Sequence, residues 1–99
     1  MDNNIISIQA ESGQVAIKFS GNLTLQNIAG IKTEIDKVLA KAKSLQLTAS
    51  EVEDIDLSFV QLILSLKAYC KTKSISVETK FELPNESERL LAKAGLKLN

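Results

Sequence analysis

The order of the segments in this sequence predicts an α/β fold: a single-domain mixed β-sheet of about four to five strands, mostly parallel with an N-terminal hairpin, covered by three helices. Segments in which apolar and polar residues alternate are interleaved with segments whose apolar residues recur every three or four positions. The turn-forming residues 11–14 separate the first two alternating segments, which indicates a hairpin. With 99 residues, the chain is long enough for one core and too short for two, so residues 1–99 are expected to form one domain.

The first half of the chain supplies the hairpin and one helix. Ile5 to Ala10 and Val15 to Phe19 are the predicted strands, and residues 20–22, Ser-Gly-Asn, are expected to end the second. Thr24 is a suitable N-cap for a helix over about Leu25 to Lys43. Its apolar positions follow the helical period.

The second half repeats the alternation of strand and helix. In chain order, the predicted elements are a strand at about Ser44 to Ala49, a helix at about Phe59 to Lys71, a strand near Ser74 to Thr79, and a third helix that starts at Pro84-Asn85 and stops at Gly95. Leu96 and Leu98 are candidates for a short last strand. Strands that alternate with helices favour parallel pairing through right-handed crossovers.

Composition narrows the classes of function. Twelve basic and twelve acidic residues cancel, and no stretch concentrates positive charge, so nucleic acid is not an expected partner. There is no histidine, and Cys70 is the only cysteine, so a zinc site, an internal disulfide and any other metal site are not expected. Cys70 is predicted to be a buried thiol. We also expect no signal segment and no membrane span, and hence a cytoplasmic protein with no direct membrane insertion.

One stretch, Glu51 to Thr72, changes character abruptly. It begins with four carboxylates in six residues and continues as the most apolar run of the chain. This pattern predicts an acidic loop that leads into a largely buried helix. Ser58 lies where the polar part ends, and it is the expected N-cap of that helix.

The element order and three short segments resemble the STAS domain of anti-sigma factor antagonists. The segments are FSGNLT before the first helix, EDIDLSFVQLIL before the second, and ESERLLAKAGL near the end. In that family a GHKL-type kinase phosphorylates the serine or threonine that directly follows an aspartate, and the modification releases the antagonist from its partner. The resemblance implies a non-catalytic, cofactor-free protein-interaction module for bacterial-type signalling.

This sequence departs from the family pattern at informative positions. Ile55 and Asp56 match, but Leu57 stands at the usual phosphoacceptor position, and Phe59 replaces the following glycine. Asn22 and Thr24 also stand where acidic residues are frequent in the family. Because leucine has no hydroxyl, the usual modification cannot occur at position 57.

Ser58 therefore has three interpretations. It is an N-cap that contributes about 1 kcal/mol, a phosphorylation site that takes over the family's switch, or an unmodified partner contact. A phosphate there would add about −1.5 to −2 charges at a helix N-terminus. It would also lie among the acidic residues of the same loop and change their surface potential.

The carboxylates Asp54 and Asp56 are candidates for acid–base groups and for cation ligands. The calcium-loop spacing is absent and no nucleophile–base pair is available, so no catalytic residue is assigned and an enzyme is not expected. A solvated acidic loop that meets a basic partner is the favoured interpretation. Leu57 and Phe59 would add apolar anchors, although core packing is an equal alternative for Phe59. The predicted partner-binding residues are Asp54, Asp56, Leu57, Ser58, Phe59 and Gln61.

Two classes of partner follow from the resemblance. The first is a GHKL-type kinase, an anti-sigma factor or another signalling complex. The alternative is the ATPase subunit of an ABC-type transport complex, which STAS proteins of this kind brace constitutively, or a chemotaxis-type signalling assembly. The signalling partner is the first expectation, while the missing hydroxyl at Leu57 is a point in favour of the alternative.

Overall fold

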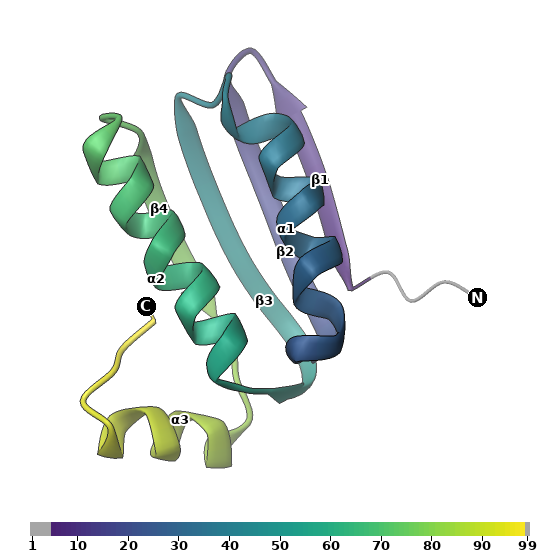
Figure 1. Ribbon diagram of the computed structural model, residues 1–99, viewed down its shortest axis with the longest axis vertical. Helices are drawn as coiled ribbons and strands as arrows, with labels where there is room; N and C mark the ends of the chain where they lie inside the picture. The colour runs from purple at the N-terminus through teal and green to yellow at the C-terminus, as the bar shows by residue number, and fades with distance from the viewer. Residues whose placement is uncertain (1–4, 99) are drawn as a thin grey trace.

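The computed structural model describes residues 5–98, which form four strands and three helices (Figure 1). In chain order the elements are β1 (Ile6–Glu11), β2 (Gln14–Leu23), α1 (Leu25–Leu39), β3 (Ser44–Ile55), α2 (Leu57–Thr72), β4 (Ser76–Phe81) and α3 (Asn85–Lys93). The strands form one sheet in the order β1-β2-β3-β4. β1 and β2 are antiparallel, whereas β2–β3 and β3–β4 are parallel. The predicted fold class is therefore confirmed.

The sheet and the helices α1 and α2 form two layers. Both crossovers, β2-α1-β3 and β3-α2-β4, move one strand in the same direction along the sheet. Right-handed crossovers of this kind place their helices on the same face, and Figure 1 shows α1 and α2 side by side over that face. On the opposite face the strands expose polar side chains such as Lys18, Gln46 and Glu78.

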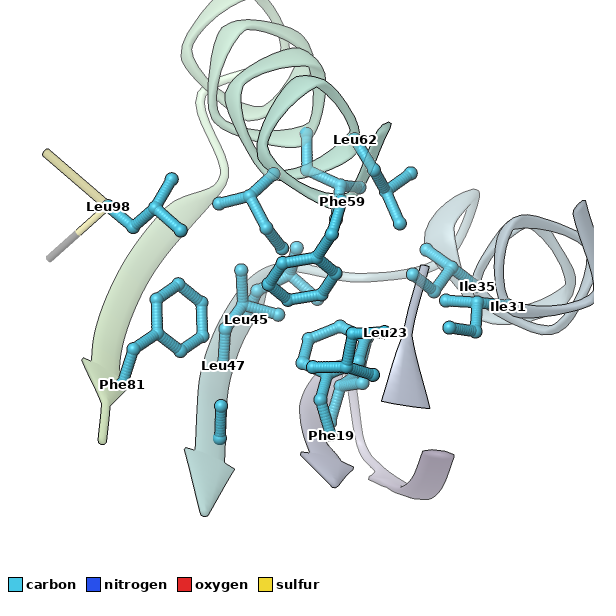
Figure 2. Packing of buried hydrophobic residues seen from close by; sticks show 14 of the residues in the cluster. Phe19, Leu23, Ile31, Ile35, Leu45, Leu47, Phe59, Leu62, Phe81 and Leu98 are labelled. Carbon is cyan, nitrogen blue, oxygen red and sulfur yellow. The ribbon is translucent and has the colours of Figure 1, made fainter. Parts of the chain in front are cut away.

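Three aromatic rings lie at the centre of the core between these layers (Figure 2). Phe19 of β2 meets Phe59 of α2 edge to face, with ring centroids 5.2 Å apart. Phe81 of β4 lies 6.5 Å from Phe19 and 6.2 Å from Phe59. Such pairs contribute about 0.5–1.5 kcal/mol beyond area burial. Cys70 is buried as predicted, and burial raises the pKa of its thiol.

Two strands are longer than the sequence predicted. β2 continues to Leu23 and β3 to Ile55, so the stretch expected to be an acidic loop is the end of a strand. The pairing continues through two irregularities, where Gly21 has φ +76° and Glu51 has φ +54°. Bulges of this type add residues to one strand without ending the ladder.

Other boundaries also differ from the prediction. α1 ends at Leu39 rather than Lys43, because the Lys43 N–H donates to the Gly13 carbonyl (2.7 Å) and draws the chain toward the hairpin turn. Gly95 ends α3 as predicted: it has φ +75°, and the Leu96 N–H donates to the Leu91 carbonyl (2.8 Å), a Schellman-type closure. No strand follows within the described residues, so the expectation for Leu96 and Leu98 is wrong.

Candidate functional site

The N-termini of α1 and α2 lie at the same end of the molecule. β2 and β3 are parallel neighbours, and their last residues, Leu23 and Ile55, are paired in the sheet. Each strand is followed within two residues by a helix, which begins at Leu25 or Leu57. Figure 1 shows both helix starts at this end of the sheet. The carboxyl ends of adjacent parallel strands are the usual place for functional sites in α/β sheets.

Asp56 connects the two helices through its carboxylate. Oδ1 accepts hydrogen bonds from the Ser58 N–H (3.0 Å) and from the Ser58 hydroxyl. Oδ2 accepts a hydrogen bond from the Leu25 N–H (2.9 Å), which belongs to the first residue of α1. Thr24 occupies the predicted N-cap position of α1, but its side chain makes no capping bond. One carboxylate thus satisfies unpaired N–H groups at the start of both helices.

These hydrogen bonds favour the ionised form of Asp56. The Ser58 hydroxyl has the largest effect and lowers the pKa of Asp56 below its ordinary value of 3.8, while desolvation opposes the shift. The backbone N–H groups of Leu25, Ser58 and Phe59 lower the pKa further. Asp56 is therefore a carboxylate at neutral pH.

Two sequence-based expectations at this junction are wrong. The N-cap of α2 is Asp56 and not Ser58, because the helix starts at Leu57. Because the helix begins at Leu57, the side chain of Phe59 points into the core, where it is 0% exposed. Phe59 is therefore not an exposed anchor. Ser58 instead lies in the first turn, half-buried, and its hydroxyl donates to Asp56.

The remaining predicted residues are accessible from solvent. Leu57 is 61% exposed, as expected, and Asp54 and Gln61 are exposed. Asp54 belongs to the end of β3, where it is paired with Asn22. The structure thus brings Asp54, Asp56, Leu57, Ser58 and Gln61 to one end of the sheet.

Leu25 is not among the residues predicted from the sequence, although it is 72% exposed and its backbone N–H donates to Asp56. No sequence signal distinguishes it, because its position three residues before Ile28 is compatible with a buried helix face. We use the term junction surface for Leu25, Asp54, Asp56, Leu57, Ser58 and Gln61.

Residues 5–98 contain neither a candidate metal cluster nor a candidate membrane-spanning helix. Among residues 5–98, no three or more cysteine or acidic side chains are grouped so as to hold a metal ion. None of the three helices in this range combines the length and the apolar character that crossing a membrane requires.

The fold resembles solved structures of known proteins. SpoIIAA, an anti-sigma factor antagonist, in its unphosphorylated form matches with a TM-score of 0.64 and 13% identity, over 92% of this chain and 99% of that one. The phosphorylated form of SpoIIAA, described as a Bacillus cell fate determinant, matches with a TM-score of 0.66 and 14% identity, over 92% and 84% of the two chains. Mglu also matches, with a TM-score of 0.58 and 15% identity, over 86% of this chain but 22% of that protein.

The family of this chain is shown by comparison of its sequence with family profiles. The profile of the family described as "Mlab, STAS domain" matches residues 6–97. The chain belongs to the STAS domain family. No curated protein matches it closely enough to narrow the function further. In this STAS domain α2 begins with an apolar side chain, Leu57, at the position that matches the usual acceptor hydroxyl of the anti-sigma factor antagonists.

Proposed function

We propose that this STAS domain is a non-catalytic subunit that binds a partner protein constitutively through the junction surface, and that the partner is the ATPase subunit of an ABC-type transport complex. One observation carries this proposal. Two exposed leucines, Leu25 and Leu57, flank a single carboxylate that fixes the start of both helices.

The leucines have the features of interface anchors. Leu25 and Leu57 project from N-termini that Asp56 ties together, and the helices behind them have buried faces. A rigid apolar group loses little conformational freedom on binding, and a few such anchors supply most of the affinity of an interface. The junction surface is therefore suited to a partner with an apolar pocket.

The surroundings of the anchors are acidic. Glu51, Glu53 and Asp54 are exposed along the last part of β3, directly before Asp56. Charges at the rim of an interface steer association and select partners more than they add affinity. We infer a partner surface with basic side chains around its apolar pocket.

The chemistry of positions 57 and 58 favours constitutive binding over a phosphorylation switch. Leu57 has no hydroxyl, and the Ser58 hydroxyl donates to the ionised Asp56. A phosphate on Ser58 would replace this attraction with repulsion between two anions in direct contact. An STAS subunit that braces an ATPase needs no acceptor hydroxyl, and we place its action in the cytoplasm.

A second candidate is a signalling role like that of the anti-sigma factor antagonists. It is supported by the similarity to SpoIIAA over 92% of the chain. In that role the partner is a GHKL-type kinase or an anti-sigma factor, and Ser58 is the phosphorylation site. The two candidates differ in the partner and in the need for a modification.

Co-purification from the native host tests both candidates. We expect wild-type protein without phosphate to retain an ABC-type ATPase subunit, and the Ser58→Ala variant, which cannot be phosphorylated, to retain it as well. Leu25→Gln and Leu57→Gln should each weaken binding by roughly tenfold or more, the range of interface hot spots. Leu90→Gln is the matched control, because Leu90 is also exposed (63%) but lies on α3. Recovery of a kinase or an anti-sigma factor, with a phosphate located on Ser58, would instead establish the signalling role.

A further inference from the structure

The sheet has an edge at β1 that no other part of the described chain covers. β1 pairs with β2 alone, and the strand order places it at one margin of the sheet (Figure 1). A free strand edge presents unpaired N–H and C=O groups, which form a template for pairing with another strand.

The hairpin geometry determines which backbone groups face outward. The turn has two central residues with positive φ, Ser12 (+53°) and Gly13 (+86°), between the paired residues Glu11 and Gln14. At the far end of the hairpin, the Ser20 N–H donates to the Ile5 carbonyl (3.0 Å). Bonded pairs alternate along an antiparallel ladder, so residues 5, 7, 9 and 11 face β2. The N–H and C=O groups of residues 6, 8 and 10 consequently point away from the sheet.

The β1 edge lacks the features that usually prevent pairing. Its sequence, ISIQAE, has no lysine and no proline, and its pairing with β2 has no register shift and hence no bulge. Its only charged residue is Glu11, at the end beside the turn. The opposite edge, β4, carries the charged residues Glu78 and Lys80. Of the two edges, β1 is the less protected.

The outward-facing residues of β1 are self-complementary. With a two-fold axis at Ile8, residue 8 pairs with residue 8 of the second copy and Ile6 pairs with Ala10. The three hydrogen-bonded pairs are 8 with 8, 6 with 10 and 10 with 6, and all of these residues have apolar side chains. Ser7 and Gln9, whose side chains lie on the opposite face of the sheet, form the pairs between them. Glu11 does not oppose another charge in this register. Ile6 and Ile8 already pack against the core cluster, so the pairing would extend its apolar face.

We propose that the free edge of β1 is a self-association site, at which two copies of this chain pair antiparallel about Ile8 and join their sheets into one of eight strands. A second copy fits this edge because residues 6, 8 and 10 are all apolar, so each hydrogen-bonded pair of the register joins two apolar side chains. This proposal does not depend on the partner at the junction surface, which involves the N-termini of α1 and α2.

Cross-linking by single cysteines tests the register. In the proposed dimer the Cα atoms of the two residues at position 8 lie about 5.5 Å apart, within the range of about 4.4–6.8 Å that a disulfide spans. Residue 7 lies opposite residue 9 of the second copy, so the Cα atoms of the two residues at position 7 are two positions apart along the strands and roughly 8 Å apart in space. Under mild oxidation, Ile8→Cys should form covalent dimers and the exposed control Ser7→Cys should form few. The buried Cys70 does not compete.

Sedimentation measurements across a range of concentrations test the association itself. We expect reversible dimers of the wild-type protein. Ile8→Lys, which places like charges opposite each other, should raise the midpoint concentration by roughly tenfold or more, equivalent to about 1.4 kcal/mol. Ala10→Pro removes only an outward-facing N–H and should also prevent dimers while the circular dichroism spectrum stays native. Ser76→Lys, on the β4 edge, should leave dimers intact. A wild-type protein that stays monomeric, or cross-linking of Ser7→Cys as fast as Ile8→Cys, would overturn the proposal.

Discussion

Exposed leucines occur both at the junction of α1 and α2 and on α3, but the helices that carry them are packed very differently. Behind Leu25 and Leu57 the two long helices bury residues against the sheet, and Asp56 ties their first turns together. Leu90 belongs to α3, a nine-residue helix with no buried residue, at the margin of the fold (Figure 1). Exposure alone therefore does not identify a docking surface. An exposed leucine on a helix that is well packed against the sheet is preorganised for binding, whereas an exposed leucine on a lightly packed helix such as α3 is not.

The largest expected effect concerns the core beneath the junction. Phe59→Ala should lower the free energy of unfolding by about 3–5 kcal/mol, because it removes a buried ring and leaves a cavity. Leu91→Ala, in the half-buried face of α3, should lower it by less than about 2 kcal/mol, below the range for a fully buried leucine. Urea denaturation of both variants measures the difference. Equal losses would mean that α3 is as firmly packed as α2.

The next effect comes from the carboxylate that joins the helices. Asp56→Ala should lower the free energy of unfolding by about 1–2 kcal/mol, because it removes the N-cap of α2 and the acceptor for α1. The control is Asp54→Ala, an exposed carboxylate two residues earlier, for which we expect a change within about 0.5 kcal/mol. Hydrogen exchange should show faster exchange of the Leu25 amide in Asp56→Ala alone. A Leu25 amide that exchanges at the wild-type rate would contradict the connection between the helices.

The same carboxylate predicts a pH dependence. The pKa of Asp56 is lower in the folded protein than in the unfolded chain, so the ionised form stabilises the fold. This contribution is fully present above the unfolded value of 3.8 and is lost as the pH falls through the folded value. The stability advantage of the wild type over Asp56→Asn should therefore be constant near neutral pH and shrink below about pH 4. Thermal melts of both proteins from neutral to acidic pH measure it. An advantage that is unchanged in acid would exclude an ionised cap.

The smallest effects on stability are expected at the exposed leucines themselves. Leu57→Gln and Leu90→Gln should each change the free energy of unfolding by no more than about 0.5 kcal/mol, since neither side chain is buried. Parallel denaturation curves check this expectation. A large loss for Leu57→Gln would mean that Leu57 packs against the fold and is not held free for a partner.

The order of the elements was predictable because strand alternation and helical spacing are local properties of the sequence. The ends of β2 and β3 were not, since both strands continue through Gly21 and Glu51 only because they pair with each other. Likewise, Asp56 and Ser58 are both suitable N-caps by residue type. In the structure Asp56 is the N-cap, and its carboxylate also accepts a hydrogen bond from Leu25, a contact across 31 positions that the sequence does not show.

The wrong expectations for Ser58 and Phe59 both follow from placing the start of α2 two residues too late. A helix that begins at Leu57 rather than Phe59 directs the phenylalanine into the core and leaves the leucine exposed. Leu57 could be identified as part of the site from the sequence because it interrupts the family's hydroxyl pattern. Leu25 could not, because its exposure depends on how α1 packs in the folded domain.

Methyl NMR spectroscopy of leucine-labelled protein, titrated with the co-purified partner, tests the central claim most directly. The claim is that unphosphorylated protein binds through the junction surface. We predict that the methyl signals of Leu25 and Leu57 shift or broaden on binding, whereas those of Leu90 keep their positions. A complex that perturbs Leu90 and leaves Leu25 and Leu57 unchanged would contradict the claim.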